Sequence, residues 1–385
     1  MKNPTHPQSK LPQVGTTIFT VMSKMAQDHG AINLTQGFPD FDCPAALREL
    51  VVKHLNDGKN QSPPMTGVQP LREAIAEKVA RLYGCEACPD AEITVTSGAT
   101  EALFDAVQAF VGAGDEVIVF DPAYDCYDPA IRLAGAVPIH VPLSTPDYRI
   151  DFVALHEALS PRTRMVIINS PHNPCGSVMS RDELDALAQA LRDRDVLVLS
   201  DEVYEHMVFD GATHCSVLGH AELREKSLAV FSFGKTYHAT GWKLAYCVAP
   251  AALSAEFRKV HQFVTFTSVS FLQYAVADFM RQCPQHADEL SQFYEQKRDR
   301  FCALLEGSRF RLAPSAGTYF QLADYSAISE KSDWDFAAEL TQQHGVAAIP
   351  LSPFYEKSPE SRLVRFCFCK DDATLEAAAE RLRSL

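Results

Sequence analysis

The sequence predicts an α/β protein with a large domain, built on a mostly parallel, doubly wound sheet, and a smaller α+β domain. Short apolar runs rich in β-branched residues alternate with helical patterns over about residues 45–275, which is typical of parallel sheets with helices on both faces. Near residue 280 this alternation ends, and long helical stretches flank short strands. The chain has 385 residues, 46% of them hydrophobic, which is sufficient for two cores.

The domain boundaries follow from these changes of pattern. We expect residues 1–44 to form an N-terminal arm and part of the small domain, residues 45–280 the large domain, and residues 281–385 the small C-terminal domain. Within the arm, residues 1–30 are expected to lead into a helix. Segment 33–40 is rich in turn-forming residues and predicts a loop.

The large domain is predicted from six apolar runs of strand length, which indicate strands buried on both faces of the sheet. Helices are expected between them. Pro70 favours a helix start and Gly84 a helix end, while Ser180 and Glu183 form a capping box before a leucine-rich helix. The predicted strands are 93–96, 116–120, 165–169, 196–200, 228–232 and 244–248. In the small domain, helical stretches 283–306 and 333–345 flank predicted strands at 317–322 and 363–368.

Charge and cysteine content narrow the functional classes. With 35 Lys and Arg against 49 Asp and Glu, the formal net charge is −14, which disfavours partners such as nucleic acid and anionic membranes. The first eleven residues lack the apolar core of a signal peptide, and no run of 18 apolar residues predicts a membrane span. We expect a cytoplasmic protein with 11 reduced cysteines. Cys85 and Cys88 form a lone CxxC, which favours ordinary thiols over a metal or redox site.

Polar residues follow four of the predicted strands, at segments 97–100, 169–174, 200–204 and 232–235. In open α/β sheets, ligands bind at the carboxyl ends of the strands. Any one of these clusters is a weak signal. Because the four occupy equivalent places in the topology, together they favour a ligand site.

Three of these residues suggest specific chemistry, and each also has a purely structural explanation. Gly98 at a helix start suits a phosphate, although an ordinary N-cap explains most Ser-Gly helix starts. Lys235 follows a buried strand, where a lysine that loses basicity can form a Schiff base; a solvated loop lysine is the alternative. Asp201 ends an apolar run and either caps a helix or pairs with a cation such as a pyridinium nitrogen. Such a pair is worth roughly 4 kcal/mol at ~4 Å and an effective dielectric of about 20.

Six short segments of the sequence form one set of motifs when their order and spacing are considered together. They are 33–41 (NLTQGFPDF), 97–103 (SGATEAL), 169–176 (NSPHNPCG), 200–204 (SDEVY), 232–243 (SFGKTYHATGWK) and 365–370 (RFCFCK). In this order and spacing the chain resembles the fold-type I pyridoxal-phosphate aminotransferases, from about residue 15 to the C-terminus. Within that family it is most similar to the class I branch of kynurenine, glutamine and methionine aminotransferases, the bacterial methionine aminotransferases above all.

The resemblance implies pyridoxal 5'-phosphate as the cofactor and assigns residues to it. Lys235 is expected to bind the cofactor covalently and then to shuttle the proton, and Asp201 to hold the pyridine N–H. Tyr204 and Asn173 are expected to hydrogen-bond the ring 3-oxygen, and Tyr124 to stack on the ring. The residues expected around the phosphate are Gly98, Ala99, Thr100, Ser232 and Lys243.

The resemblance also implies a substrate site shared across a homodimer. Arg365 is expected to bind the substrate α-carboxylate, a bidentate task suited to arginine, with help from Asn173 and the Gly37 backbone. Phe19, and Phe266 contributed by the second subunit, are expected to line the side-chain pocket. Core packing is the alternative explanation for both aromatic residues.

Two positions depart from the family pattern. A tyrosine that reaches the phosphate across the dimer interface commonly follows the pair that matches Asn60 and Gln61, whereas this chain has Ser62. Because serine is shorter, we expect either a bridging water or weaker phosphate binding there. Many relatives place Arg where Lys243 stands; lysine supplies the charge without the bidentate fork.

These residues predict an aminotransferase that moves the amino group of an L-amino acid to a 2-oxo acid by a ping-pong mechanism. The apolar and aromatic pocket residues, with no second arginine identifiable, favour methionine, aromatic, glutamine or kynurenine-type donors over aspartate. One alternative keeps the cofactor and makes the enzyme a C–S β-lyase. A cofactor-binding transcription regulator is a second alternative, which the short N-terminal region and the charge of −14 disfavour.

Overall fold

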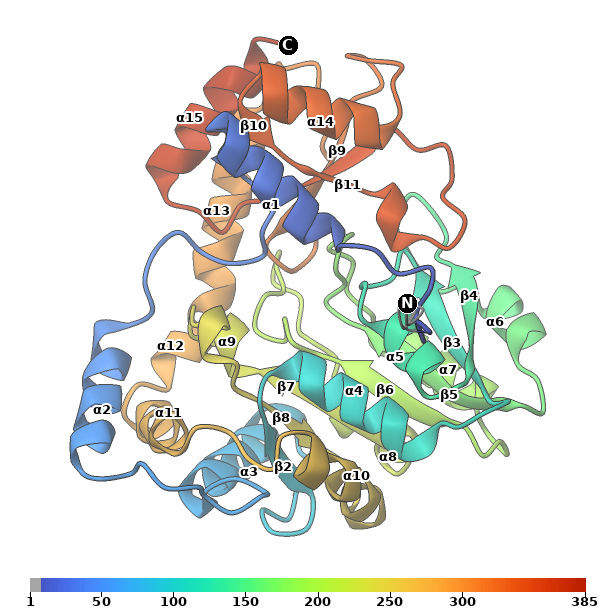
Figure 1. The fold of residues 1–385 in the computed structure, drawn as a ribbon, viewed down its shortest axis with the longest axis vertical. Helices are drawn as coiled ribbons and strands as arrows, with labels where there is room; N and C mark the ends of the chain where they lie inside the picture. The colour runs from blue at the N-terminus through green and yellow to red at the C-terminus, as the bar shows by residue number, and fades with distance from the viewer. Residues whose placement is uncertain (1–7) are drawn as a thin grey trace, which may run out of the picture.

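A seven-stranded sheet forms the centre of the computed structural model, which describes residues 8–385 (Figure 1). The first seven residues of the predicted N-terminal arm lie outside the described chain. In their order across the sheet the strands are β2 (Ile93–Thr96), β8 (Ala245–Val248), β7 (Ser227–Ser232), β6 (Leu197–Asp201), β5 (Thr163–Asn169), β3 (Glu116–Asp121) and β4 (Val137–Pro142). Strands β3 to β7 pair in parallel, whereas β8 is antiparallel to both β2 and β7. The predicted mostly parallel sheet is therefore confirmed.

All six predicted strands of this sheet are present, with ends within two residues of those expected. The edge strand β4 was not predicted. It carries Pro138 and Pro142, and Val137 is exposed. Because proline cannot donate a hydrogen bond, it occurs in sheets almost only on edge strands, which hides such a strand from a search for continuous apolar runs.

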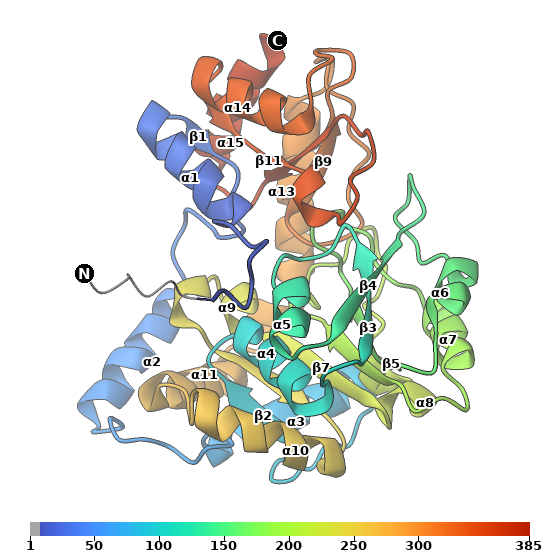
Figure 2. The ribbon, with the colours of Figure 1, turned by 45° about the vertical axis from the view of Figure 1, so that its right-hand side comes forward.

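Helices cover both faces of the sheet, as a doubly wound fold requires (Figure 2). One face packs against α4 (Ala99–Phe110), α5 (Tyr127–Leu133) and α10 (Ala251–Val264). The other packs against α3 (Gln69–Tyr83), α6 (Phe152–Ala158), α7 (Arg181–Ala190), α8 (Ala221–Arg224) and α11 (Ser270–Gln282), with α2 (Ala45–Asn56) against α11. Helix α3 ends at Gly84 in the left-handed region, at φ 64°, and α7 begins with the predicted capping box of Ser180 and Glu183. The short helix α9 (Phe233–Thr236) follows β7.

A separate core joins the start of the chain to its C-terminal part. Helix α1 (Ile18–His29) lies beside α14 (Asp333–Gln343) in both views (Figures 1 and 2), as expected for an arm that completes the smaller domain. The remaining elements are a three-stranded antiparallel sheet of β11 (Ile349–Pro350), β12 (Leu363–Cys367) and β9 (Phe320–Asp324), the parallel pair β1 (Ile32–Asn33) and β10 (Val346–Ala347), and helices α13 (Leu290–Leu304) and α15 (Asp372–Arg383). The domain boundaries stay a prediction.

Two predicted elements differ from the structure. The helix expected over 283–306 is divided, because α11 continues to Gln282, α12 spans Gln285–Asp288 and α13 begins at Leu290; Pro284, which lacks an N–H, stands at the first break. The strand expected at 317–322 begins only at Phe320, since Thr318 has a φ of 67°. Within residues 8–385, no helix has both the length and the apolar character needed to span a membrane.

Candidate active site

A cavity of about 270 Å³ lies where β5, β6 and β7 end, between the large sheet and the C-terminal core. The parallel direction of these strands brings their terminal residues to one edge, as the polar clusters in the sequence suggested. Thirteen of the predicted site residues line it: Phe19, Gly37, Gly98, Ala99, Thr100, Tyr124, Asn173, Asp201, Tyr204, Ser232, Lys235, Lys243 and Arg365.

Lys235 lies in α9, and the Ser232 side chain caps this short helix by accepting the Lys235 backbone N–H. Its Nζ donates hydrogen bonds to the carbonyl oxygen of Gly37 at 3.0 Å and to the hydroxyl of Tyr319 at 2.9 Å. Burial lowers the pKa of Lys235 to about 8. At that pKa roughly a tenth of the amine is free at pH 7, against roughly 0.04% for an ordinary lysine, so Lys235 is suited to act as a nucleophile and base.

Asp201 ends β6 and is buried, 3% exposed. Burial raises the pKa of its carboxyl to about 6. Its Oδ2 accepts the hydroxyl hydrogen of Tyr127 at 2.6 Å, and its Oδ1 faces the backbone N–H of Val203 at 3.4 Å. These donors favour the ionised form. A buried carboxylate without a cation on it is suited to hold a protonated nitrogen inside the cavity.

Arg365 comes from β12 and is fully buried. Its two terminal nitrogens donate to Asn173 Oδ1 and to the carbonyl oxygen of Thr35, each at 2.7 Å, and its Nε has no hydrogen-bond partner within the described chain. The guanidinium stacks on the ring of Phe320, 3.8 Å from the centroid. Because these partners are neutral, the positive charge is uncompensated, and a carboxylate entering the cavity meets a fixed cation.

The start of α4, which lines the same cavity as Lys235, is suited to bind an anion. Gly98 precedes the helix with a φ of 90°, and the first backbone N–H groups of α4 lack acceptors within the helix. A Cβ built at Gly98 would lie only 3.0 Å from the Lys243 side chain. Glycine therefore leaves room for the lysine to approach the helix start, so that a cation and free N–H groups point toward the same place.

Aromatic rings form the wall beside Arg365. Phe19 packs against Tyr124 and Phe354, with ring centroids 6.4 and 5.9 Å away, and Tyr204 packs edge-on against Phe320. Within this chain, the only cationic side chains that line the cavity between residues 8 and 385 are Lys235, Lys243 and Arg365. The rest of the wall is apolar or uncharged apart from Asp201.

Two predicted residues lie away from the cavity. Ser62 and Phe266 do not line it, and both are exposed, Phe266 by 50%. Their expected contacts are with a second subunit, and those contacts stay a prediction. Conversely, sequence reasoning missed Tyr127 and Tyr319, which contact Asp201 and Lys235. The only signal for Tyr127 was its closeness in sequence to Tyr124.

Known proteins share this sequence and this fold. A model of the family described as aminotransferase class I and II matches residues 29–382. The chain belongs to the class I and II aminotransferases. It is 55% identical to the methionine aminotransferase of Escherichia coli strain K12, over 100% of this chain and 99% of that protein. It is 40% identical to the probable N-succinyldiaminopimelate aminotransferase DapC of Mycobacterium tuberculosis, over 98% of both. The crystal structure of YbdL from E. coli, identified as having a methionine aminotransferase function, superposes with a TM-score of 0.97 at 55% identity, over 99% of this chain and 100% of that one.

The family recognised in the sequence is therefore confirmed, and the protein is an aminotransferase. The matches extend over both cores, so the cavity belongs to the shared fold. The individual roles assigned to its residues stay predictions, because the comparisons concern whole chains.

Proposed function

We propose that this aminotransferase uses pyridoxal 5'-phosphate to move the amino group of an L-amino acid of the methionine, aromatic, glutamine or kynurenine type to a 2-oxo acid, by a ping-pong mechanism. The observation that carries the proposal is the charge arrangement of one cavity. It combines Lys235 with its lowered pKa, the buried Asp201 and a buried Arg365 that has no counter-ion within the described residues.

The residues fit this cofactor at three separate points. The start of α4, with Lys243 and the Ser232 hydroxyl, suits a phosphate. Asp201 suits a protonated ring nitrogen, because burial disfavours its negative charge and no cation of residues 8–385 forms a salt bridge with it. Lys235 suits the aldehyde. When bound, the cofactor supplies an electron-accepting ring that stabilises negative charge at the substrate Cα.

The chain's own groups then move and hold protons. Lys235 takes the proton from the substrate Cα, and the hydroxyl of Tyr319 and the carbonyl of Gly37 hold its amine toward the cavity. Asp201 keeps the ring nitrogen protonated. Tyr204 and Asn173 line the same cavity and would donate hydrogen bonds to the ring 3-oxygen. The half-buried Tyr124 is suited to stack on the ring.

The substrate carboxylate is assigned to Arg365, whose rigid fork Asn173 and Thr35 hold in place. The side-chain pocket then falls among Phe19 and its aromatic neighbours, where this chain provides no further cation between residues 8 and 385. Apolar burial favours a thioether or an aromatic ring over a second carboxylate. The E. coli relative named methionine aminotransferase supports the same donor.

We also propose a homodimer in the cytoplasm. The end of α10 and the turn before α11 expose Phe263 by 86%, Val264 by 49%, Phe266 by 50% and Val269 by 47%. An apolar surface of this kind usually marks an interface, and a second copy would cover it. Light scattering of the active protein tests this: an active monomer contradicts the shared active site.

The visible spectrum of the purified protein, titrated with a panel of amino acids, tests the function. We expect an absorbance band from the bound cofactor that methionine removes and aspartate does not. Lys235→Ala should abolish turnover, and appreciable residual transamination by this variant contradicts the assignment. The β-lyase alternative has no support among the relatives named above; it requires ammonia and a 2-oxo acid without any amino acceptor, which a direct assay of ammonia release detects.

A further inference from the structure

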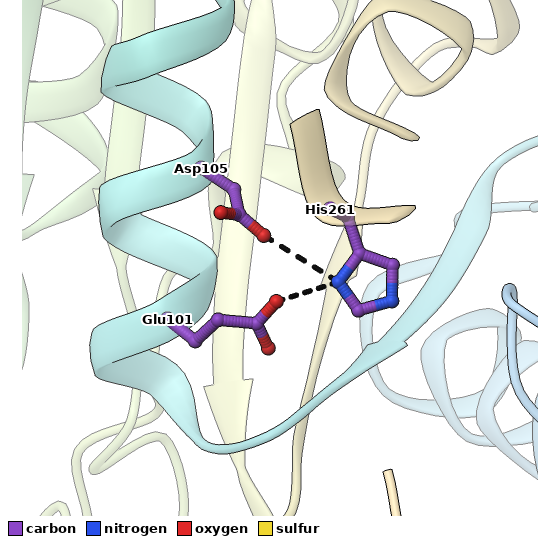
Figure 3. Close-up of side chains that lie close together, drawn as sticks. All are labelled: Glu101, Asp105 and His261. Atoms are coloured by element: carbon purple, nitrogen blue, oxygen red, sulfur yellow. Dashed lines mark hydrogen bonds and ion pairs between the residues drawn. The ribbon is translucent and has the colours of Figure 1, made fainter. Parts of the chain in front are cut away.

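A buried group of charged residues lies behind the first turn of α4 (Figure 3). Glu101 and Asp105 stand one turn apart on α4, and His261 reaches them from α10. His261 and Asp105 are fully buried. His261 Nδ1 lies 2.6 Å from Glu101 Oε1 and 3.4 Å from Asp105 Oδ2. None of the three lines the cavity.

The partners of His261 define its protonation. Nε2 lies 3.0 Å from the carbonyl oxygen of Met65, which can only accept, so Nε2 carries a hydrogen. Nδ1 faces two carboxylates and also donates. Burial acts to lower the pKa of His261, but the hydrogen bond with Glu101 and the Asp105 carboxylate 3.4 Å away outweigh this and raise the pKa to about 9. His261 is therefore an imidazolium at neutral pH.

The same three residues could in principle hold a metal ion, but the distances favour a proton. Two ligand atoms at about 2.1 Å from one ion in tetrahedral geometry lie roughly 3.4 Å apart. The 2.6 Å between Nδ1 and Glu101 Oε1 is a charge-assisted hydrogen bond. The Asp105 carboxyl also favours a proton over a metal ion. Burial raises its pKa to about 7, so it is only partly ionised at neutral pH and is a weaker metal ligand.

This cluster holds the turn that the proposed function assigns to the phosphate. The second oxygen of Glu101, Oε2, accepts the backbone N–H of Ser97 at 2.5 Å, and the next residues, Gly98 and Ala99, line the cavity. A carboxylate in this first turn acts against an anion there, because like charges repel. His261 cancels that charge and ties the turn to the Met65 segment.

We propose that His261 is a positioning residue for the cofactor phosphate: it neutralises Glu101 and fixes the first turn of α4 against the Met65 segment. The proposal rests on the proposed function. It concerns binding of the phosphate and assigns His261 no contact with the substrate or the cofactor.

The test compares two ligands that differ only in the phosphate. Apoenzyme is titrated with pyridoxal 5'-phosphate and with pyridoxal, and dissociation constants are measured from the visible spectrum. We expect His261→Phe to weaken pyridoxal phosphate binding by about tenfold or more and to leave pyridoxal binding within about twofold. Equal losses for both ligands, or no loss, overturn the proposal. Failure of the wild-type protein to bind pyridoxal phosphate would instead refute the proposed function.

A second variant separates charge from packing. Glu101→Gln added to His261→Phe removes the uncompensated carboxylate, while the amide oxygen can still accept the Ser97 N–H. We expect the double variant to regain most of the pyridoxal phosphate affinity that His261→Phe loses. If it regains none, the claim that His261 acts by neutralising Glu101 is refuted. If His261→Phe does not fold, His261→Gln is measured, with the same preference between ligands expected.

Arg258→Met is the matched control on the same helix. Arg258 binds Thr94 Oγ1 and the carbonyls of Asp90 and Ile93, and makes no hydrogen bond to the first turn of α4. Even if this variant is less thermally stable than the wild type, we expect its ratio of the dissociation constants for pyridoxal and pyridoxal phosphate to be unchanged. Dialysis of the wild-type apoenzyme against EDTA should also leave the ratio of the two dissociation constants unchanged. A change in this ratio after chelation would mean that the three residues hold a metal ion, and refutes the assignment of a proton to His261.

Discussion

The hydrogen bond between Tyr127 and Asp201 can be tested by deleting one oxygen atom. In Tyr127→Phe the ring remains, and Asp201 Oδ2 loses its donor at 2.6 Å. A hydrogen bond to a charged group contributes about 1.5–3 kcal/mol, and about 1.4 kcal/mol corresponds to one pKa unit. We therefore expect the pKa of the Asp201 carboxyl to rise from about 6 by about one to two units.

At neutral pH the variant then holds a largely protonated Asp201, which binds a protonated ring nitrogen poorly. The assay is kcat/KM for amino transfer between pH 5 and 9. We expect the acidic limb of this profile to move upward by about one unit or more. Tyr294→Phe is the control, because its hydroxyl binds His238 Nδ1 at 3.0 Å and not Asp201. An unmoved acidic limb in Tyr127→Phe, with Tyr294→Phe also unchanged, refutes the reasoning.

Three further predictions concern the clamp, the phosphate site and pH. Arg365→Lys loses the bidentate fork, so KM for amino acids should rise by about tenfold or more while the cofactor band remains; an unchanged KM contradicts the clamp. Gly98→Ala places a Cβ 3.0 Å from the Lys243 side chain at a φ of 90°, and we expect weaker pyridoxal phosphate binding in titrations, with unchanged affinity as the contrary result. His140 is buried, which acts to lower its pKa, but hydrogen bonds to Asp121 and Asp128 raise it to about 9. Because the folded-state pKa is raised, its stabilisation is complete below about pH 6.5 and is lost as pH rises through about 9. Melting temperatures of the wild type should therefore fall over this range more steeply than those of His140→Gln; parallel curves refute the assignment.

The parts of the fold that the sequence predicted are those with a strong local signal. Buried parallel strands are continuous apolar runs, so 165–169 and 228–232 were found with small errors at their ends. The edge strand Val137–Pro142 has two prolines and an exposed Val137, and lacks that signal. The shift of the strand start to Phe320 follows from the positive φ of Thr318, which no periodicity expresses.

The residues of the candidate site also divide into those with a local sequence signal and those without one. Lys235, Asp201 and Arg365 stand in recognisable segments, and the topology brings them to one cavity. Tyr319 and His261 stand in no such segment. Their importance depends on partners far away in sequence, Lys235 in one case and Glu101 and Met65 in the other. Such pairings arise from tertiary packing and have no local pattern.

The bond from Arg365 to the Thr35 carbonyl oxygen joins residues 330 positions apart, and this has a consequence for the order in which the protein matures. A ribosome synthesises Lys235 and the whole seven-stranded sheet more than a hundred residues before it reaches Arg365. Contacts of such long range form late in folding, because the chain must close a very long loop to make them. The nascent chain therefore contains the residues that would hold the cofactor before it can select a substrate by its carboxylate, and amino-acid recognition is completed last.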